Sequence, residues 1–192
     1  IVGLSLASLI AVVFLGLWHQ SGPILANQAI TAACVQESRT GSVSVHYLNG
    51  DCHMTPLLSY LHIPGVEFAT WSLDCSPECR KSPDLECENH RFQRDPSEFV
   101  THAYEGHKVP PDFVVTYSSY LGDVSNSLQA FTSCRVVGNY PHHLVGASIF
   151  RSGFGDVNSS IYRSINMSGL DGSFFVEDVV LLHCSTREGS TL

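Results

Sequence analysis

Residues 174–184 read Phe-Phe-Val-Glu-Asp-Val-Val-Leu-Leu-His-Cys, and they are the most apolar of the short segments in the C-terminal half of the chain. A run of this length, rich in Phe, Val and Leu, is typical of a strand buried inside a sheet. We therefore expect a central strand here, and the remainder of the fold is worked out from it.

Similar apolar segments precede this one, separated by clusters of Gly, Asn, Asp and Pro such as Gly138-Asn139-Tyr140-Pro141. A further segment at 42–48 alternates cleanly and ends in the turn signal Asn49-Gly50. Regular short strands with such punctuation are typical of an antiparallel sandwich or barrel. The predicted fold is therefore mainly β, an antiparallel β-sandwich or barrel-like domain with strands at 42–48, 113–120, 128–137, 143–150, 159–167 and 174–184.

Residues 1–18 are apolar throughout, and no charged residue occurs before Glu37. Eighteen residues of helix rise about 27 Å, close to the ~30 Å thickness of the hydrocarbon core of a bilayer. The segment therefore predicts a single-pass transmembrane helix, and a secretory signal peptide or a buried core helix are the alternatives. Gly3, Ala7 and Ala11 lie on one stripe of this helix, where small residues let another membrane helix approach closely.

The remaining chain divides by composition. Residues 19–40 are expected to form a polar stem, and residues 41–192 the β-rich domain. Residues 74–112 hold 14 of the 28 charged residues, three cysteines and five prolines, so we expect a long, Cys-rich loop that carries specificity. Within it, Asp95-Pro96-Ser97-Glu98 has the pattern of a helix start.

All seven cysteines follow the apolar segment. In an oxidising compartment this number predicts three disulfides and one remaining thiol, with the pairing open. Two glycosylation sequons, at Asn158 and Asn166, agree with a domain that is extracellular or in an organelle lumen. The disulfide candidates are Cys34, Cys52, Cys75, Cys79, Cys87, Cys134 and Cys184.

Cofactor and catalytic signals are weak in this sequence. Cys75, Cys79, Cys87 and His90 could supply a zinc site, but disulfide pairing explains the cysteines as well, and we expect no cofactor. No G-x-S-x-G elbow or P-loop is present. Ten basic residues against eighteen acidic ones, a net charge of −8, exclude an ordinary nucleic-acid-binding surface.

These observations predict a non-enzymatic, membrane-anchored ectodomain. It would act as an accessory or structural subunit of a larger, oligomeric assembly, in contact with the lipid bilayer and with other membrane proteins. The alternatives are an adhesion or receptor-recognition glycoprotein and a lumenal hydrolase that uses zinc or a Ser-His-Asp triad. Five aromatic residues in or beside the charged loop are candidates for a protein interface: Phe68, Trp71, Phe99, Tyr104 and Phe113.

Overall fold

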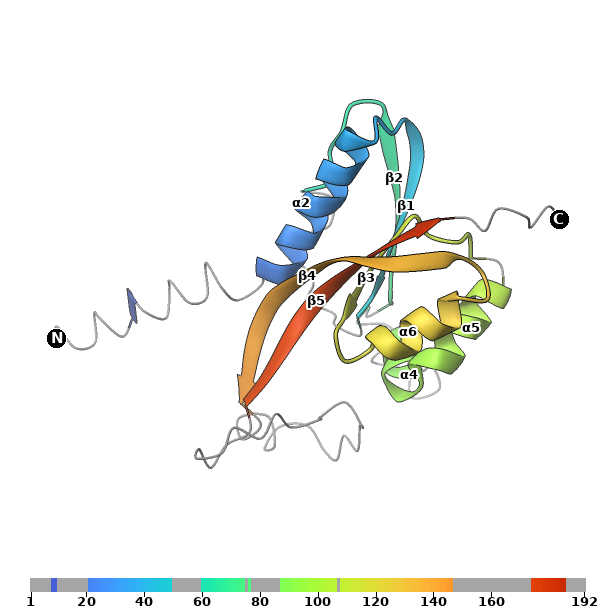
Figure 1. Cartoon of the computed structure of the whole chain (residues 1–192). Helices are drawn as coiled ribbons and strands as arrows, with labels where there is room; N and C mark the ends of the chain where they lie inside the picture. The colour runs from blue at the N-terminus through green and yellow to red at the C-terminus, as the bar shows by residue number, and fades with distance from the viewer. Residues whose placement is uncertain are drawn as a thin grey trace.

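The computed structural model describes residues 8–9, 21–49, 60–74, 76, 87–106, 108–146 and 174–185. These residues form one five-stranded sheet, in the order β2-β1-β3-β5-β4, with helices packed on it (Figure 1). The elements in chain order are α2 (Ser21–Gln36), β1 (Gly41–Leu48), β2 (Val66–Ser72), α4 (Glu88–Arg94), α5 (Pro96–Glu105), β3 (Phe113–Tyr117), α6 (Leu121–Leu128), β4 (Ser133–Gly146) and β5 (Phe174–Ser185).

The predicted β-sandwich or barrel is wrong, because the structure has a single open sheet of mixed direction. Strand β1 runs parallel to both β2 and β3, whereas β5 is antiparallel to β3 and to β4. Parallel strands need long crossover connections. The connection between β2 and β3, which lie on either side of β1, contains the helices α4 and α5. The sequence pattern identified strands correctly at 42–48 and 174–184 but could not reveal their direction.

The predicted single-pass transmembrane helix is also not supported. In the described part of the chain, no helix is both long enough and apolar enough to cross a membrane. Residues 1–18, apart from Ser8 and Leu9, lie outside the described residues, and so does the packing stripe of Gly3, Ala7 and Ala11.

Most of the segment expected to be a polar stem forms the helix α2. Ala26, Ile30 and Cys34 follow one another at four-residue spacing and are all buried, so they form the stripe that packs on the sheet. Polar and small residues between them, such as Asn27, hide this period in the sequence. Asn27 is itself fully buried and accepts a hydrogen bond from the Tyr47 phenol, 2.6 Å away.

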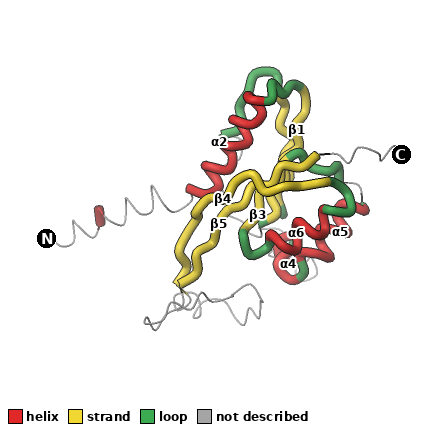
Figure 2. Tube along the Cα trace, in the orientation of Figure 1, coloured by secondary structure: helices red, strands yellow, loops and turns green. Residues whose placement is uncertain are grey.

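Both faces of the sheet are covered, which makes the described region a three-layer α/β arrangement. Successive residues of a strand point to opposite faces. On β1, Tyr47 bonds to Asn27 of α2, whereas the neighbouring His46 contacts Tyr104 of α5. Figure 2 shows α2 on one side of the strands and the group α4, α5 and α6 on the other. All five residues of β3 are accordingly buried.

A disulfide joins the last two strands of the sheet. Cys134 of β4 lies opposite Cys184 of β5, and their sulfurs are bonded. Cys87 is also disulfide-bonded, whereas Cys34 is a free, buried thiol. Cys52, Cys75, Cys79 and the sequon asparagines Asn158 and Asn166 lie outside the described residues.

The charged segment 74–112 contains two short helices where it is described. The expected helix start at Asp95 is confirmed, because the Asp95 carboxylate accepts a 2.8 Å hydrogen bond from the backbone N–H of Glu98, and Pro96 occupies the first turn of α5. The backbone N–H of Asp95 instead closes α4 by donating to the Arg91 carbonyl oxygen. One aspartate thus ends α4 and begins α5.

Candidate ligand-binding pocket

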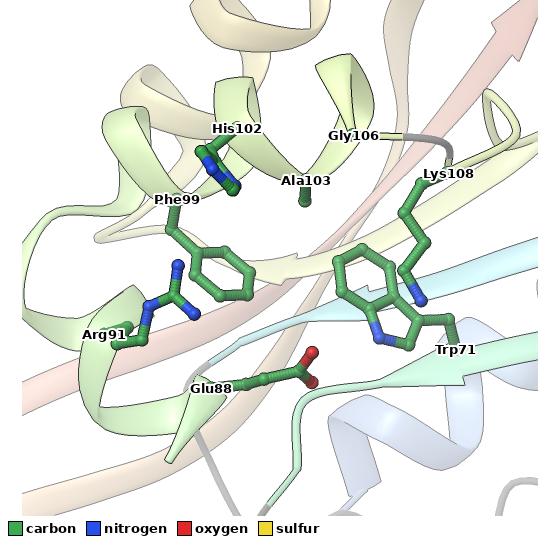
Figure 3. A pocket seen from close by; sticks show the side chains of 8 residues that line it. All are labelled: Trp71, Glu88, Arg91, Phe99, His102, Ala103, Gly106 and Lys108. Atoms are coloured by element: carbon green, nitrogen blue, oxygen red, sulfur yellow. The ribbon is translucent and has the colours of Figure 1, made fainter. Parts of the chain in front are cut away.

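A pocket of about 380 Å³ opens between the end of β2, the helices α4 and α5, and the segment that follows α5. Seven of its eight lining residues come from the charged segment 74–112, and Trp71 comes from β2. Its volume falls in the range of small-molecule sites, about 300–1,000 Å³. The lining side chains are Trp71, Glu88, Arg91, Phe99, His102, Ala103, Gly106 and Lys108 (Figure 3).

Two aromatic rings dominate this pocket. The planes of Trp71 and Phe99 are inclined by only 18°, and their centroids are 6.2 Å apart. Figure 3 shows the two rings side by side, both seen face-on. Two neighbouring rings in nearly parallel planes offer a flat apolar surface on which a ring-shaped ligand can pack.

Each of the two rings carries one cation. The Lys108 ammonium lies 4.4 Å from the centroid of the Trp71 ring, and the Arg91 guanidinium lies 5.5 Å from that of Phe99. Such cation–π contacts contribute about 0.5–1 kcal/mol at exposed sites. They hold the two long side chains at the edge of the pocket, while both charged ends remain exposed to solvent.

Glu88 is the carboxylate that lines the pocket, and it also fixes the start of α4. Its Oε2 accepts a 3.0 Å hydrogen bond from the backbone N–H of Asp74, just beyond the end of β2. The backbone N–H of Asn89 donates to the Asp74 carbonyl oxygen at 3.4 Å. These bonds tie α4 to the end of the strand that carries Trp71, so the relative positions of Arg91 and Trp71 follow from backbone contacts.

A buried polar network lies beneath Trp71. His46 meets the indole edge-on at 5.2 Å, and its Nδ1 lies 2.5 Å from the Tyr104 hydroxyl. Its Nε2 lies 3.0 Å from the Ser44 hydroxyl. Burial, with a smaller contribution from the Lys108 charge, lowers the pKa of His46 to about 4. Burial also raises the pKa of the Tyr104 phenol, so a neutral imidazole and a protonated phenol support the indole at neutral pH.

This arrangement offers a ligand one carboxylate, because Glu88 is the acidic side chain among the described residues that line the pocket. No cluster of three or more His, Cys, Asp or Glu that could hold a metal occurs in the described part of the chain. The possible zinc ligands in the sequence included Cys87 and His90. Cys87 is disulfide-bonded, so its sulfur is not a free thiolate, and His90 is exposed on α4.

The structure brings together only some of the predicted interface residues. Trp71 and Phe99 line the pocket, and Tyr104 supports it from below. Phe113 lies on the opposite face of the sheet, stacked on His183 at 4.8 Å. Phe68 is paired with Val43 in the strand register and so points to that opposite face as well.

Sequence reasoning did not single out Arg91, Lys108 or Glu88, and it interpreted His102 as a surface histidine. They lie in the charged segment expected to carry specificity, but each looks like an ordinary surface residue when taken alone. What distinguishes these residues is that they lie close to Trp71. This proximity depends on the pairing of β2 with β1 and on the turn between α4 and α5. No periodicity in the sequence encodes that juxtaposition.

No protein-family model and no solved structure matches the chain. The chain is similar to GPI alpha-1,2-mannosyltransferase 3 of Danio rerio, with 27% identity over 127 residues. The matched region covers 66% of this chain and 23% of that protein, so the chain spans less than a quarter of the length of this relative. The similarity is thus to one part of a much longer mannosyltransferase.

Proposed function

We propose that the chain is a glycan-binding domain of a protein that transfers mannose to a GPI, and that it recognises the glycan without performing the transfer. The observation that carries this proposal is the pocket floored by Trp71 and Phe99, in a chain similar to part of a GPI mannosyltransferase. The proposal retains the accessory, non-enzymatic role expected from the sequence, but assigns it to glycan recognition.

The chemistry of the pocket fits a sugar ring. One face of a pyranose exposes C–H groups, which pack against a flat aromatic surface, while its hydroxyl groups need donors and acceptors at the rim. Glu88 supplies carboxylate oxygens and Arg91 supplies guanidinium donors, both at the edge of the rings. The exposed His102 imidazole lies on α5 at the same rim.

The residues of the pocket support a role in binding rather than in transfer. A single carboxylate that already accepts a hydrogen bond from the Asp74 backbone is a poor general base. His46 meets the Trp71 ring edge-on, but it is buried and engaged by Tyr104 and Ser44. The disulfide between Cys134 and Cys184 supports a location outside the reducing cytosol, in an organelle lumen or at the cell surface.

Titration of the full chain with α-1,2-linked mannobiose, followed by calorimetry, tests the proposal. The disaccharide should bind to the wild-type chain, and Trp71→Ala should weaken binding at least tenfold, the loss of about 1.4 kcal/mol. Phe68→Ala is the matched control, since it truncates an aromatic residue of the same strand on the opposite face. Absence of mannobiose binding, or equal binding by wild type and Trp71→Ala, would overturn the proposal.

A further inference from the structure

We infer that this pocket takes a phosphorylated glycan, with the sugar ring on Trp71 and Phe99 and the phosphate between Lys108 and Arg91. This inference rests on the proposed function and specifies its ligand. It starts from the pairing of one cation with each ring: Lys108 over Trp71 at 4.4 Å and Arg91 over Phe99 at 5.5 Å. Each of the two rings that would hold the sugar therefore has a cation next to it.

The two cations are unusual in this chain. Acidic residues outnumber basic ones by eighteen to ten, so an average surface patch would be negative. At the pocket, two basic side chains face one carboxylate, and Glu88 is engaged by the Asp74 backbone. Among the described residues, neither Arg91 nor Lys108 forms an ion pair with a carboxylate. Both charges are therefore free to meet an anionic ligand.

Phosphate is the anion that these two side chains suit best. The planar guanidinium of Arg91 can donate two parallel hydrogen bonds to phosphate oxygens, and the Lys108 ammonium adds a mobile point charge. A cation over an exposed ring is held only by a weak attraction. Because a charge-assisted hydrogen bond to phosphate is stronger, an arriving phosphate can draw both side chains off the ring faces and expose them to the sugar.

A ligand that satisfies every group in the pocket therefore combines an apolar ring face, hydroxyl groups for Glu88 and an anion for the two cations. A neutral glycan provides no anion for the charges of Arg91 and Lys108, and inorganic phosphate leaves both rings unused. A nucleotide also has a ring and phosphate, but its flat base offers no hydroxyl group to Glu88, and its ribose is separated from the base face. The observations favour the phosphorylated sugar.

Calorimetric titration of the full chain with mannose, mannose 6-phosphate, inorganic phosphate and adenosine monophosphate tests the inference. Mannose 6-phosphate should bind at least tenfold more tightly than mannose, and also more tightly than either of the other two probes. The advantage over mannose should shrink as salt is raised from 50 to 500 mM, since exposed charges are screened.

The double variant Arg91→Gln/Lys108→Gln should abolish the difference in affinity between mannose 6-phosphate and mannose. Arg94→Gln is the matched control, because Arg94 lies on the same helix but does not line the pocket. Equal affinities of the wild-type chain for mannose and mannose 6-phosphate would overturn this inference and leave the proposed glycan-binding function standing. Phosphate or the nucleotide binding as tightly as mannose 6-phosphate would also overturn it. If the chain binds no mannoside at all, both proposals fail.

Discussion

The Nδ1 atom of His46 lies 2.5 Å from the hydroxyl oxygen of Tyr104, and this contact joins the strand β1 to the helix α5, which also carries Phe99 of the pocket. Both residues are buried. With the phenol donating to Nδ1, the ring proton lies on Nε2 and is donated to Ser44. The pair therefore satisfies its polar atoms only while the imidazole is neutral, which makes the stability of the fold sensitive to pH.

Acidification should destabilise the protein through His46. Its pKa is about 4 in the folded state and 6.5 in the unfolded chain, so the unfolded state binds more protons between these values. The contribution to stability is complete above pH 6.5 and is lost as the pH falls toward 4, amounting to about 2 kcal/mol between pH 7 and pH 5. Urea denaturation of the wild-type chain at the two pH values measures this loss.

The variant His46→Gln keeps a polar side chain that can meet Tyr104 but does not titrate, so the decrease in its free energy of unfolding from pH 7 to pH 5 should be smaller by about 2 kcal/mol. His62→Gln is the control for the loss of an imidazole, because His62 is exposed and takes no part in the contacts of His46. An undiminished pH dependence in His46→Gln would show that another group is responsible.

The bond between Tyr47 and Asn27 should behave differently, because both partners are fully buried and neither is charged. Tyr47→Phe removes the donor and leaves the Asn27 carbonyl oxygen buried without it, at a cost of about 1–3 kcal/mol. The Asn27 side-chain nitrogen already has no hydrogen-bond partner among the described residues. Replacing both residues, as Tyr47→Phe/Asn27→Leu, should therefore recover most of the stability lost by either single variant.

A double-mutant cycle of these variants, measured by chemical denaturation, gives the coupling energy. Additive losses in the double variant would mean that α2 is held on the sheet by apolar packing, with no contribution from this hydrogen bond.

The sequence predicted the parts of this fold that local patterns encode. Alternation located β1, an apolar run located β5, and the Asp95-Pro96 pattern located the start of α5. It failed where the decisive information was not local. The expected strands at 113–120 and 128–137 left only a short connection between them, yet residues 118–128 form a turn and α6, in which Val124 and Leu128 are buried one helical turn apart. The direction of β3 relative to β1 and β2 depends on the crossover that contains α4 and α5, and the charge and proline content of this segment had led to the prediction of a loop.

Only part of the pocket could likewise be predicted from the sequence. The aromatic residues Trp71, Phe99 and Tyr104 were selected because of their size and their place near the charged segment. Their assignment to a protein interface remains untested by the structure, but Phe68 and Phe113 are separated from them by the thickness of the sheet. Whether a strand residue faces the pocket depends on which of the two faces α5 covers, and a sheet buried on both sides leaves no polar alternation to reveal it.

The N-terminal cap of α5 should stabilise the helix through the Asp95 side chain alone, without a reciprocal hydrogen bond from the Glu98 side chain. Asp95→Ala removes the acceptor for the Glu98 backbone N–H and should cost about 1 kcal/mol, while Asp95→Asn keeps an acceptor and should cost less. Glu98→Gln should cost only a few tenths of a kcal/mol through the helix dipole, since the Asp95 backbone N–H donates to Arg91 and not to the Glu98 side chain. Thermal denaturation of the three variants checks this order, and a larger loss in Glu98→Gln than in Asp95→Ala would contradict it.

The disulfide between Cys134 and Cys184 closes a loop with a sequence separation of 50 residues. In the chain-entropy view, such a closure stabilises the folded state by about 4 kcal/mol, because it restricts the unfolded chain. Cys134→Ala/Cys184→Ala should therefore lower the free energy of unfolding by about 2–4 kcal/mol. The pocket lies on other strands and helices, so the affinity for mannosides should persist wherever the variant remains folded.

Cys34→Ala is the matched control for this loss, because Cys34 is a free thiol buried against the sheet and closes no loop. Its replacement removes one sulfur atom from the core and should cost less than the double variant. Denaturation in urea, with thiol counting on the unfolded proteins, separates the two effects. If both variants lose the same free energy of unfolding, the loss would come from side-chain packing at the cysteines. The cross-link between β4 and β5 would then contribute little to stability.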